Sequence, residues 1–95
     1  MSELQITGHS ILPKGDLVAE KIRSLYEQSP TFESADYEID LSEVKKSDSA
    51  GLALLVYWYR QAGDKNGRIV FKNCPETMLE MARLNGLGEM FVPVV

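Results

Sequence analysis

Apolar and polar residues alternate in short blocks along the chain, and the blocks predict strands interspersed with helices. Residues 37–41 follow the two-residue period of a half-buried strand. Residues 68–72 contain a continuous apolar run, which favours a central strand covered on both faces. Shorter extended segments are expected at 4–6 and 10–12, broken by Gly8 and Pro13.

Three segments have the spacing of helices. The first is expected over about residues 17–28, with Asp16 as its cap. The second is expected over about residues 50–62, with Gly63 ending it in the left-handed conformation. Proline at a first helical position predicts the third helix at about residues 75–84.

The order of these elements predicts the fold class. A last strand is expected at 90–95, at a sheet edge because Pro93 cannot donate to a ladder. Strands that alternate with helices indicate parallel neighbours joined by crossover helices. We therefore expect one α/β domain over residues 1–95, with a mixed sheet of about four to five strands and about three to four helices. It would be α+β if the helices lie on one face of the sheet.

The second predicted helix has more apolar residues than one buried face requires. Residues 52–59 are apolar without interruption, whereas a helix on a sheet needs only one apolar stripe. At about 100° per residue the sequence separates into two sides. The side assigned to the core contains Leu52, Leu55, Val56, Tyr59 and Ala62. The outer side contains Ala53, Leu54, Tyr57 and Gln61, with Trp58 at the boundary.

Two interpretations of the outer side remain open. The helix is either sandwiched inside its own domain or exposes this side to a protein partner. A chain of 95 residues rarely has enough layers to bury both sides of a helix. Exposed aromatic and aliphatic patches usually mark interfaces, so we favour a contact surface that includes Leu54, Tyr57 and Trp58.

Composition excludes several classes of function. The net charge of −4 argues against a nucleic-acid-binding protein, because phosphate binding needs an excess of basic residues. One cysteine, Cys74, allows no internal disulfide and no metal-ligand spacing. The first residues have no secretory signal, and the longest apolar run is too short to span a membrane. We expect a cytoplasmic protein that reaches a membrane only through a partner.

The polar junction before the second helix contains the candidate chemistry, Asp48 and Ser49. Free N–H groups and the dipole of a helix N-terminus favour negative charge, including a phosphate on Ser49. The alternative is that one of the two residues is simply the N-cap; both roles are compatible.

Catalytic sites are not indicated. A serine nucleophile needs a nearby base, and the only histidine is His9 in the N-terminal segment. The glycines form no phosphate-binding loop, and Glu76 and Glu80 are interpreted as the solvated side of the third helix. We expect no catalytic residue, no metal ligand and no cofactor.

The chain resembles the STAS family of anti-sigma-factor antagonists and transporter-associated domains. The residues that carry the resemblance are Ile39-Asp40-Leu41, Asp48-Ser49-Ala50-Gly51-Leu52, Gly67 with Ile69-Val70-Phe71, and Leu84-Asn85-Gly86-Leu87. Its short length and the continuation Leu52-Ala53-Leu54-Leu55 are most similar to the STAS subunits of the Mla phospholipid-transport complex of Gram-negative bacteria.

The resemblance implies an adaptor that binds the ATPase subunit of an inner-membrane ABC transporter, with the hydroxyl of Ser49 at the contact. The alternative from the same family is an anti-sigma-factor antagonist, in which a serine at this position is phosphorylated by a kinase. The expected partner-binding residues are Asp48, Ser49, Ala50, Gly51, Ala53, Leu54, Tyr57, Trp58 and Gln61.

Overall fold

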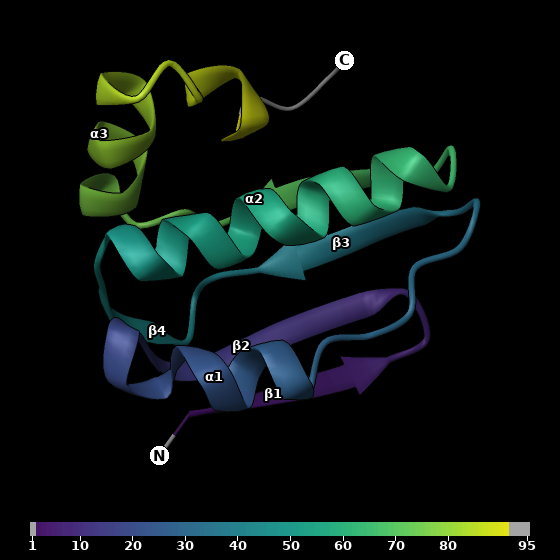
Figure 1. Ribbon diagram of the computed structural model, residues 1–95, viewed down its shortest axis with the longest axis horizontal. Helices are drawn as coiled ribbons and strands as arrows, with labels where there is room; N and C mark the ends of the chain where they lie inside the picture. Colours follow the sequence, from purple (N-terminus) through teal and green to yellow (C-terminus); the bar gives the residue numbers. More distant parts are fainter. Residues whose placement is uncertain (1, 92–95) are drawn as a thin grey trace.

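The computed structural model describes residues 2–91, in which a five-stranded sheet begins with a hairpin (Figure 1). β1 (Glu3–Thr7) pairs antiparallel with β2 (Ser10–Leu17). Gly8, in the turn, has a φ of 59°, a left-handed value that glycine adopts readily. Both strands are longer than the short segments expected from the sequence.

Pro13 lies inside β2 and is buried, although proline was expected to end the strand. On one side β2 pairs with β3 at Ser10 and Ile11, and further along it pairs with β4 at Gly15 and Leu17. Pro13 lies between these two regions and is in register with neither strand. A proline is tolerated in a sheet where no N–H donor is required, which explains the unbroken strand.

The remaining strands run parallel to their neighbours. β3 (Asp36–Asp40) pairs with β2, and β5 (Arg68–Lys72) pairs with β3, so that the order is β1-β2-β3-β5. β5 has the expected bounds, and β3 begins one residue before the expected segment. β4 (Val44–Ser47) pairs with the second half of β2. β4 was not expected, because its two exposed lysines make the segment resemble a polar loop in the sequence.

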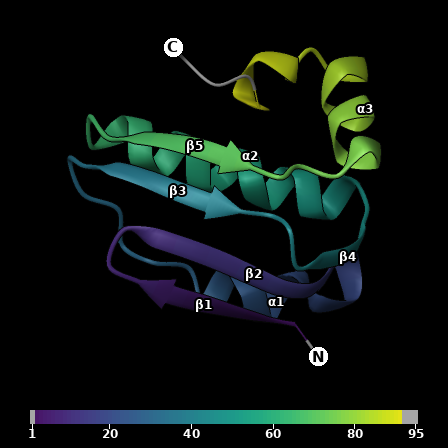
Figure 2. The same cartoon turned by 180° about the vertical axis from the view of Figure 1, so that it is seen from behind.

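β5 lies at the edge of the sheet, which corrects the expectation of a central strand covered on both faces. Ile69 and Phe71 are buried on one face, whereas Val70 points to the other and is 37% exposed. Figure 2 shows this second face, which none of the described helices covers. The continuous apolar run in β5 therefore contains one exposed residue.

Two helices cover the other face of the sheet. α1 (Ala19–Glu27) and α2 (Ser49–Asp64) lie side by side there, and α3 (Glu76–Leu84) and the 3-10 helix η1 (Gly88–Phe91) lie on the side of α2 away from α1 (Figures 1 and 2). The helices lie on one face of the sheet, the arrangement for which α+β was the alternative. The parallel strand pairs joined by crossover helices nevertheless confirm the α/β class, and the numbers of strands and helices are as expected.

The helix ends differ from the expected ones. α1 begins after Val18 and Asp16 does not cap it. α2 continues through Gly63, which does not have a left-handed φ. The left-handed residue is Asn66, with a φ of 61°, and the N–H of the following Gly67 donates to the carbonyl of Ala62 at 2.7 Å. α2 therefore ends at Asp64, after Gly63, the glycine that was expected to end it.

The expected strand at 90–95 is wrong in the part that the structure describes. Met90 and Phe91 belong to η1 and are buried, and residues 92–95 lie outside the described part. Phe91 packs on Phe71 of β5, with ring centroids 4.8 Å apart. Burial against the sheet edge fixes this segment without strand pairing.

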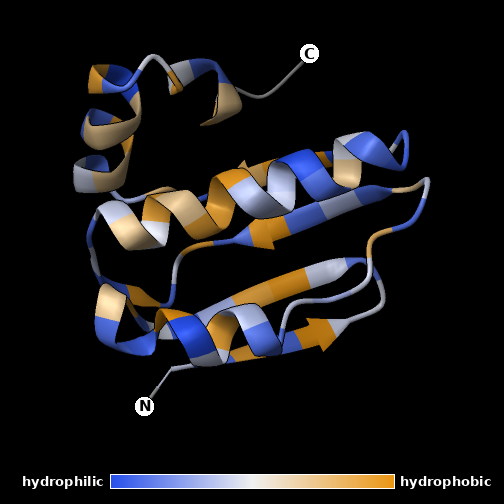
Figure 3. Ribbon diagram, viewed as in Figure 1, coloured by the Kyte–Doolittle hydropathy of each residue, from blue (hydrophilic) through white to orange (hydrophobic). Residues whose placement is uncertain are grey.

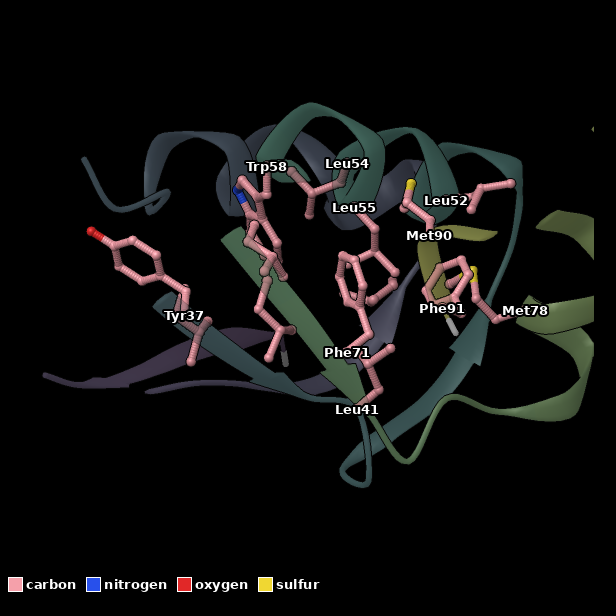
Figure 4. Close-up of a cluster of buried hydrophobic side chains, with 14 of the residues drawn as sticks. Tyr37, Leu41, Leu52, Leu54, Leu55, Trp58, Phe71, Met78, Met90 and Phe91 are labelled. Carbon is pink, nitrogen blue, oxygen red and sulfur yellow. The ribbon is translucent and has the colours of Figure 1, made fainter. Parts of the chain in front are cut away.

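The core lies between α2 and the sheet. Figure 4 shows Leu55 above Phe71, and Met90 and Phe91 beside them. Leu55 is fully buried and Phe71 is 5% exposed. Figure 3 shows that hydrophobic residues line much of α2, whereas the turn after it is hydrophilic. The buried residues of α2 therefore pack into the core, whereas its first residue, Ser49, which follows β4, is exposed.

Candidate functional site

The start of α2 is held by the carboxylate of Asp48. Oδ1 accepts hydrogen bonds from the backbone N–H groups of Ala50 at 2.9 Å and Gly51 at 3.2 Å. Oδ2 accepts from the N–H of Ala19, the first residue of α1, at 3.1 Å. One side chain therefore caps α2 and also binds the start of α1. Of the two residues expected as possible N-caps, Asp48 is the cap and Ser49 is not.

These hydrogen bonds set the protonation of Asp48. The N–H of Ala19 is the largest cause that lowers the pKa of Asp48 below its ordinary value of 3.8, and the N–H groups of Gly51 and Ala50 add to it, while burial opposes them. A backbone donor favours the charged carboxylate. Asp48 is ionised at neutral pH and places a negative charge beside Ser49.

Gly51 brings α2 close to the end of β2. A Cβ at this position would lie 2.2 Å from the carbonyl oxygen of Leu17 and 2.8 Å from its Cβ. Gly51 is itself buried. The glycine expected in a partner contact is therefore covered by Leu17 of the same chain, and its lack of a side chain serves packing between helix and strand.

The buried side of α2 differs from the predicted one. Leu54 and Trp58 were assigned to the contact surface, but both are fully buried. Tyr59 was assigned to the core and is 42% exposed, and Val56 is half-buried. Leu52, Leu55 and Ala62 are buried as expected.

The cause of this difference is α1. It packs beside α2 on the same face of the sheet, so α2 buries residues toward the sheet and also toward α1. The indole N–H of Trp58 donates to the hydroxyl of Ser29 at 2.8 Å, and Ser29 donates to the carbonyl of Leu25 at 3.1 Å. Leu54 lies one turn before Trp58 on the same side. The buried side of α2 is therefore rotated about the helix axis toward α1, relative to the side predicted from the sequence, by less than the roughly 100° between successive residues.

The exposed side of α2 retains part of the predicted surface. We call it the outer face of α2 and define it as Ser49, Ala53, Tyr57, Arg60 and Gln61, all of them exposed. Asp48 and Ala50 beside it are half-buried. Ser49 is the first residue of the helix, and its side chain is outside the cap that Asp48 forms.

A groove runs along the outer face of α2 on the side of α3 and η1. Its volume is about 390 Å³. The side chains that line it are Ser49, Leu52, Ala53, Val56, Tyr57, Arg60, Asn85 and Leu87. Arg60, Asn85 and Leu87 were not expected as site residues, because the helix pattern alone does not show that the turn after α3 returns to α2. The resemblance had already marked the Leu84-Asn85-Gly86-Leu87 segment, which was the available signal.

An aromatic pair borders the groove on the side of α1. Tyr57 packs against Tyr26 of α1 with ring centroids 5.0 Å apart, and the two are 40% and 37% exposed. A second hollow of about 250 Å³ lies on the far side of this pair, lined also by Thr31 and Gln61. Tyr57 therefore forms a ridge between two hollows, a shape suited to contact with another protein.

Reactive groups are sparse in the described part of the chain. The turn that holds His9 is at the opposite end of the sheet from the start of α2 (Figure 1). Burial raises the pKa of Cys74 to about 11, and the charge of Glu76 adds to this effect, so Cys74 is a weak nucleophile at neutral pH. Among residues 2–91 no group of histidine, cysteine and carboxylate side chains could hold a metal ion.

None of the helices described in residues 2–91 is both long and apolar enough to cross a membrane.

The sequence model of a family described as "Mlab, STAS domain" matches residues 3–93. No curated protein matches the sequence.

Solved structures of anti-sigma factor antagonists share the fold. SpoIIAA in its unphosphorylated form superposes with a TM-score of 0.68 at 16% identity, covering 100% of this chain and 89% of that chain. The Bacillus cell fate determinant SpoIIAA in its phosphorylated form gives 0.66 at 17% identity, covering 100% and 92%. An anti-sigma factor antagonist from Mycobacterium paratuberculosis gives 0.53 at 20% identity, covering 100% and 86%. At these identities the similarity concerns the fold alone.

Proposed function

The chain belongs to the STAS family, in its MlaB-like branch, and on this premise we propose that it is a non-enzymatic adaptor of a phospholipid ABC transporter. Its partner is an MlaF-like ATPase subunit on the cytoplasmic side of the inner membrane. The adaptor supports this ATPase in a complex that maintains the lipid asymmetry of the outer membrane. It reaches the membrane only through the ATPase and does not insert into it.

The observation that carries this proposal is the outer face of α2. It combines an exposed tyrosine, small residues and a neutral hydroxyl next to an apolar groove. Aromatic side chains beside hollows are frequent anchors of protein interfaces. Ala53 is small enough to let a partner backbone approach the helix. This combination suits a partner protein better than a small substrate, because the groove is open and lacks reactive groups.

Ser49 is the polar centre of the proposed contact. It is exposed at the first position of α2, one residue after the charged Asp48. A partner that covers Ser49 meets a neutral hydroxyl and has no charge to desolvate there. A carboxylate or a phosphate at position 49 would add a second negative charge beside Asp48, and burying it would weaken the complex.

The exposure of Ser49 also favours a second candidate, a phosphorylated partner switch in a sigma-factor pathway. A kinase can reach an exposed hydroxyl at the start of a helix, and the dipole of α2 tolerates the added charge. In this case the partner would be an anti-sigma factor, and phosphorylation would release it. The outer face of α2 would be the contact surface in both cases.

Affinity purification from the source cell separates the two candidates. The tagged protein is captured before and after a Tyr57→Ala substitution, and the bound proteins are identified by mass spectrometry. Recovery of a transporter ATPase with the unsubstituted protein, and its loss with Tyr57→Ala, is the expected result. Recovery of a serine kinase of the anti-sigma type in place of the ATPase would overturn the transporter proposal and support the second candidate.

A further inference from the structure

Arg60 is the one charged residue among the eight that line the groove beside the outer face of α2. The other lining residues are apolar or neutral. Arg60 also borders a neighbouring hollow of about 260 Å³, which extends the groove toward η1. Val56 and Leu87 line both hollows, so the two are continuous past the Arg60 side chain.

The guanidinium of Arg60 is available to a partner. Arg60 is exposed, and the ion pairs found among residues 2–91 involve Arg23, Arg68, Lys72 and Arg83 and not Arg60. Glu89 lines the neighbouring hollow with Arg60 but is not within ion-pair distance of it. The cation is thus solvated while the groove is open.

A partner that fills the groove would change the hydration of the Arg60 guanidinium. A partner side chain over Val56 and Leu87 would remove water from the adjacent guanidinium. A cation that loses water without gaining an anion opposes binding. An apolar partner segment alone would therefore bind poorly, whereas one with a carboxylate next to its apolar side chain would bind well.

We infer that the groove receives a segment of the ATPase in which an apolar side chain is followed by an aspartate or glutamate that pairs with Arg60. This inference rests on the proposed function and specifies the chemistry of its contact. The geometry of a guanidinium favours paired hydrogen bonds to a carboxylate. The apolar floor of the groove provides affinity, and Arg60 selects the acidic segment among other apolar ones.

Binding to the purified ATPase tests the inference through variants at position 60. Arg60→Ala is expected to weaken binding about tenfold or more, and Arg60→Glu more strongly, because its charge repels the partner carboxylate. The salt dependence of binding should be smaller for Arg60→Ala than for the unsubstituted protein. Arg23→Ala is the control, since Arg23 lies on α1 with its side chain 94% exposed, and its affinity should be unchanged.

A carbodiimide cross-link identifies the carboxylate directly. Arg60→Lys keeps the positive charge and introduces an amine that a carbodiimide joins to a carboxylate in contact with it. The expected product links position 60 to an aspartate or glutamate of the ATPase. Normal binding by Arg60→Glu, or no cross-link at position 60 in a formed complex, would overturn the inference and leave the proposed function intact. Failure of the unsubstituted protein to bind the ATPase would overturn both.

Discussion

At the scale of single residues, one carboxylate and one indole fix the position of α2. Asp48 accepts hydrogen bonds from the starts of both α1 and α2, and Trp58 donates to Ser29 just after α1. These two contacts join the helices near opposite ends. The sequence pattern correctly placed Asp48 at the helix start. It placed Trp58 at the edge of the exposed side, although Trp58 is buried, because a helical pattern does not show where α1 packs.

Leu54→Ala is expected to destabilise the protein by about 2 to 5 kcal/mol, the usual range for a truncated buried leucine. Leu54 is fully buried, which reverses the expectation that this residue forms the contact surface. Tyr57→Ala should cost about 1 kcal/mol or less, because Tyr57 is 40% exposed and loses mainly its packing on Tyr26. Denaturant unfolding of both variants measures the difference. Equal losses would contradict the observed faces of α2.

Asp48→Asn is expected to reduce the dependence of stability on acid pH. The folded pKa of Asp48 is lowered below 3.8, so the carboxylate stabilises the fold fully above its unfolded pKa. This contribution is lost as pH falls through the lowered folded pKa. Asparagine keeps one accepting oxygen and can still cap α2, but its amide nitrogen is a donor and cannot accept the hydrogen bond that the N–H of Ala19 gives to Oδ2.

Thermal unfolding between about pH 7 and pH 2 checks this expectation, since the ordinary pKa of aspartate lies within the range. The unsubstituted protein should be more stable than Asp48→Asn at neutral pH, and the difference should shrink toward pH 2. A constant difference across the range would assign the effect to packing and not to the charge.

At the scale of elements, local pattern was enough wherever an element depends on its own residues. β5 has the expected bounds and α3 begins within one residue of the expected position, because a short apolar run and a proline start are local signals. β4 was missed because Lys45 and Lys46 are exposed and its pairing with β2 is remote in sequence. The groove of the candidate site was missed for the same reason, since Leu87 meets α2 only in the fold.

Gly51→Ala is expected to separate α2 from β2 and to cost about 1 to 3 kcal/mol, as overpacking does. The added Cβ would lie 2.2 Å from the backbone oxygen of Leu17, which cannot turn away as a side chain can. Gly63→Ala is the matched control in the same helix. A Cβ there meets nothing within 4 Å, so this change should stabilise the protein by about 0.5 to 1 kcal/mol.

Chemical denaturation of the two glycine variants tests the close approach. Opposite signs are expected for the two changes. A neutral Gly51→Ala would mean that α2 and β2 relax without cost, and the position of Ser49 relative to α1 would then be less rigid than the structure indicates.

At the scale of the whole molecule, the two faces of the sheet have different roles. The helix face holds the core, and the outer face of α2 forms its surface. The opposite face presents exposed ion pairs, Arg68 with Asp36 at 3.4 Å and Lys72 with Glu38, and solvent-exposed pairs of this kind contribute little to stability. This solvated face suits a protein that contacts its partner through one side only.

Lys72→Ala is expected to leave both partner affinity and stability nearly unchanged. Its side chain lies on the uncovered face and is 55% exposed. Binding within about twofold of the unsubstituted protein, and an unfolding midpoint close to that of the unsubstituted protein, are the expected results. A large loss of affinity would show that the partner also covers the second face of the sheet.

The central claim is that the adaptor binds its ATPase through Ser49 and the outer face of α2. A calorimetric titration of the purified ATPase with Ser49→Thr, Ser49→Ala and Ser49→Glu tests it, with thermal unfolding of each variant run in parallel. All three should unfold near the temperature of the unsubstituted protein, because Asp48 provides the cap. Affinity should be nearly kept by Ser49→Thr, reduced by Ser49→Ala, and reduced about tenfold or more by Ser49→Glu. Equal affinities for the three variants would contradict the claim and exclude Ser49 from the interface.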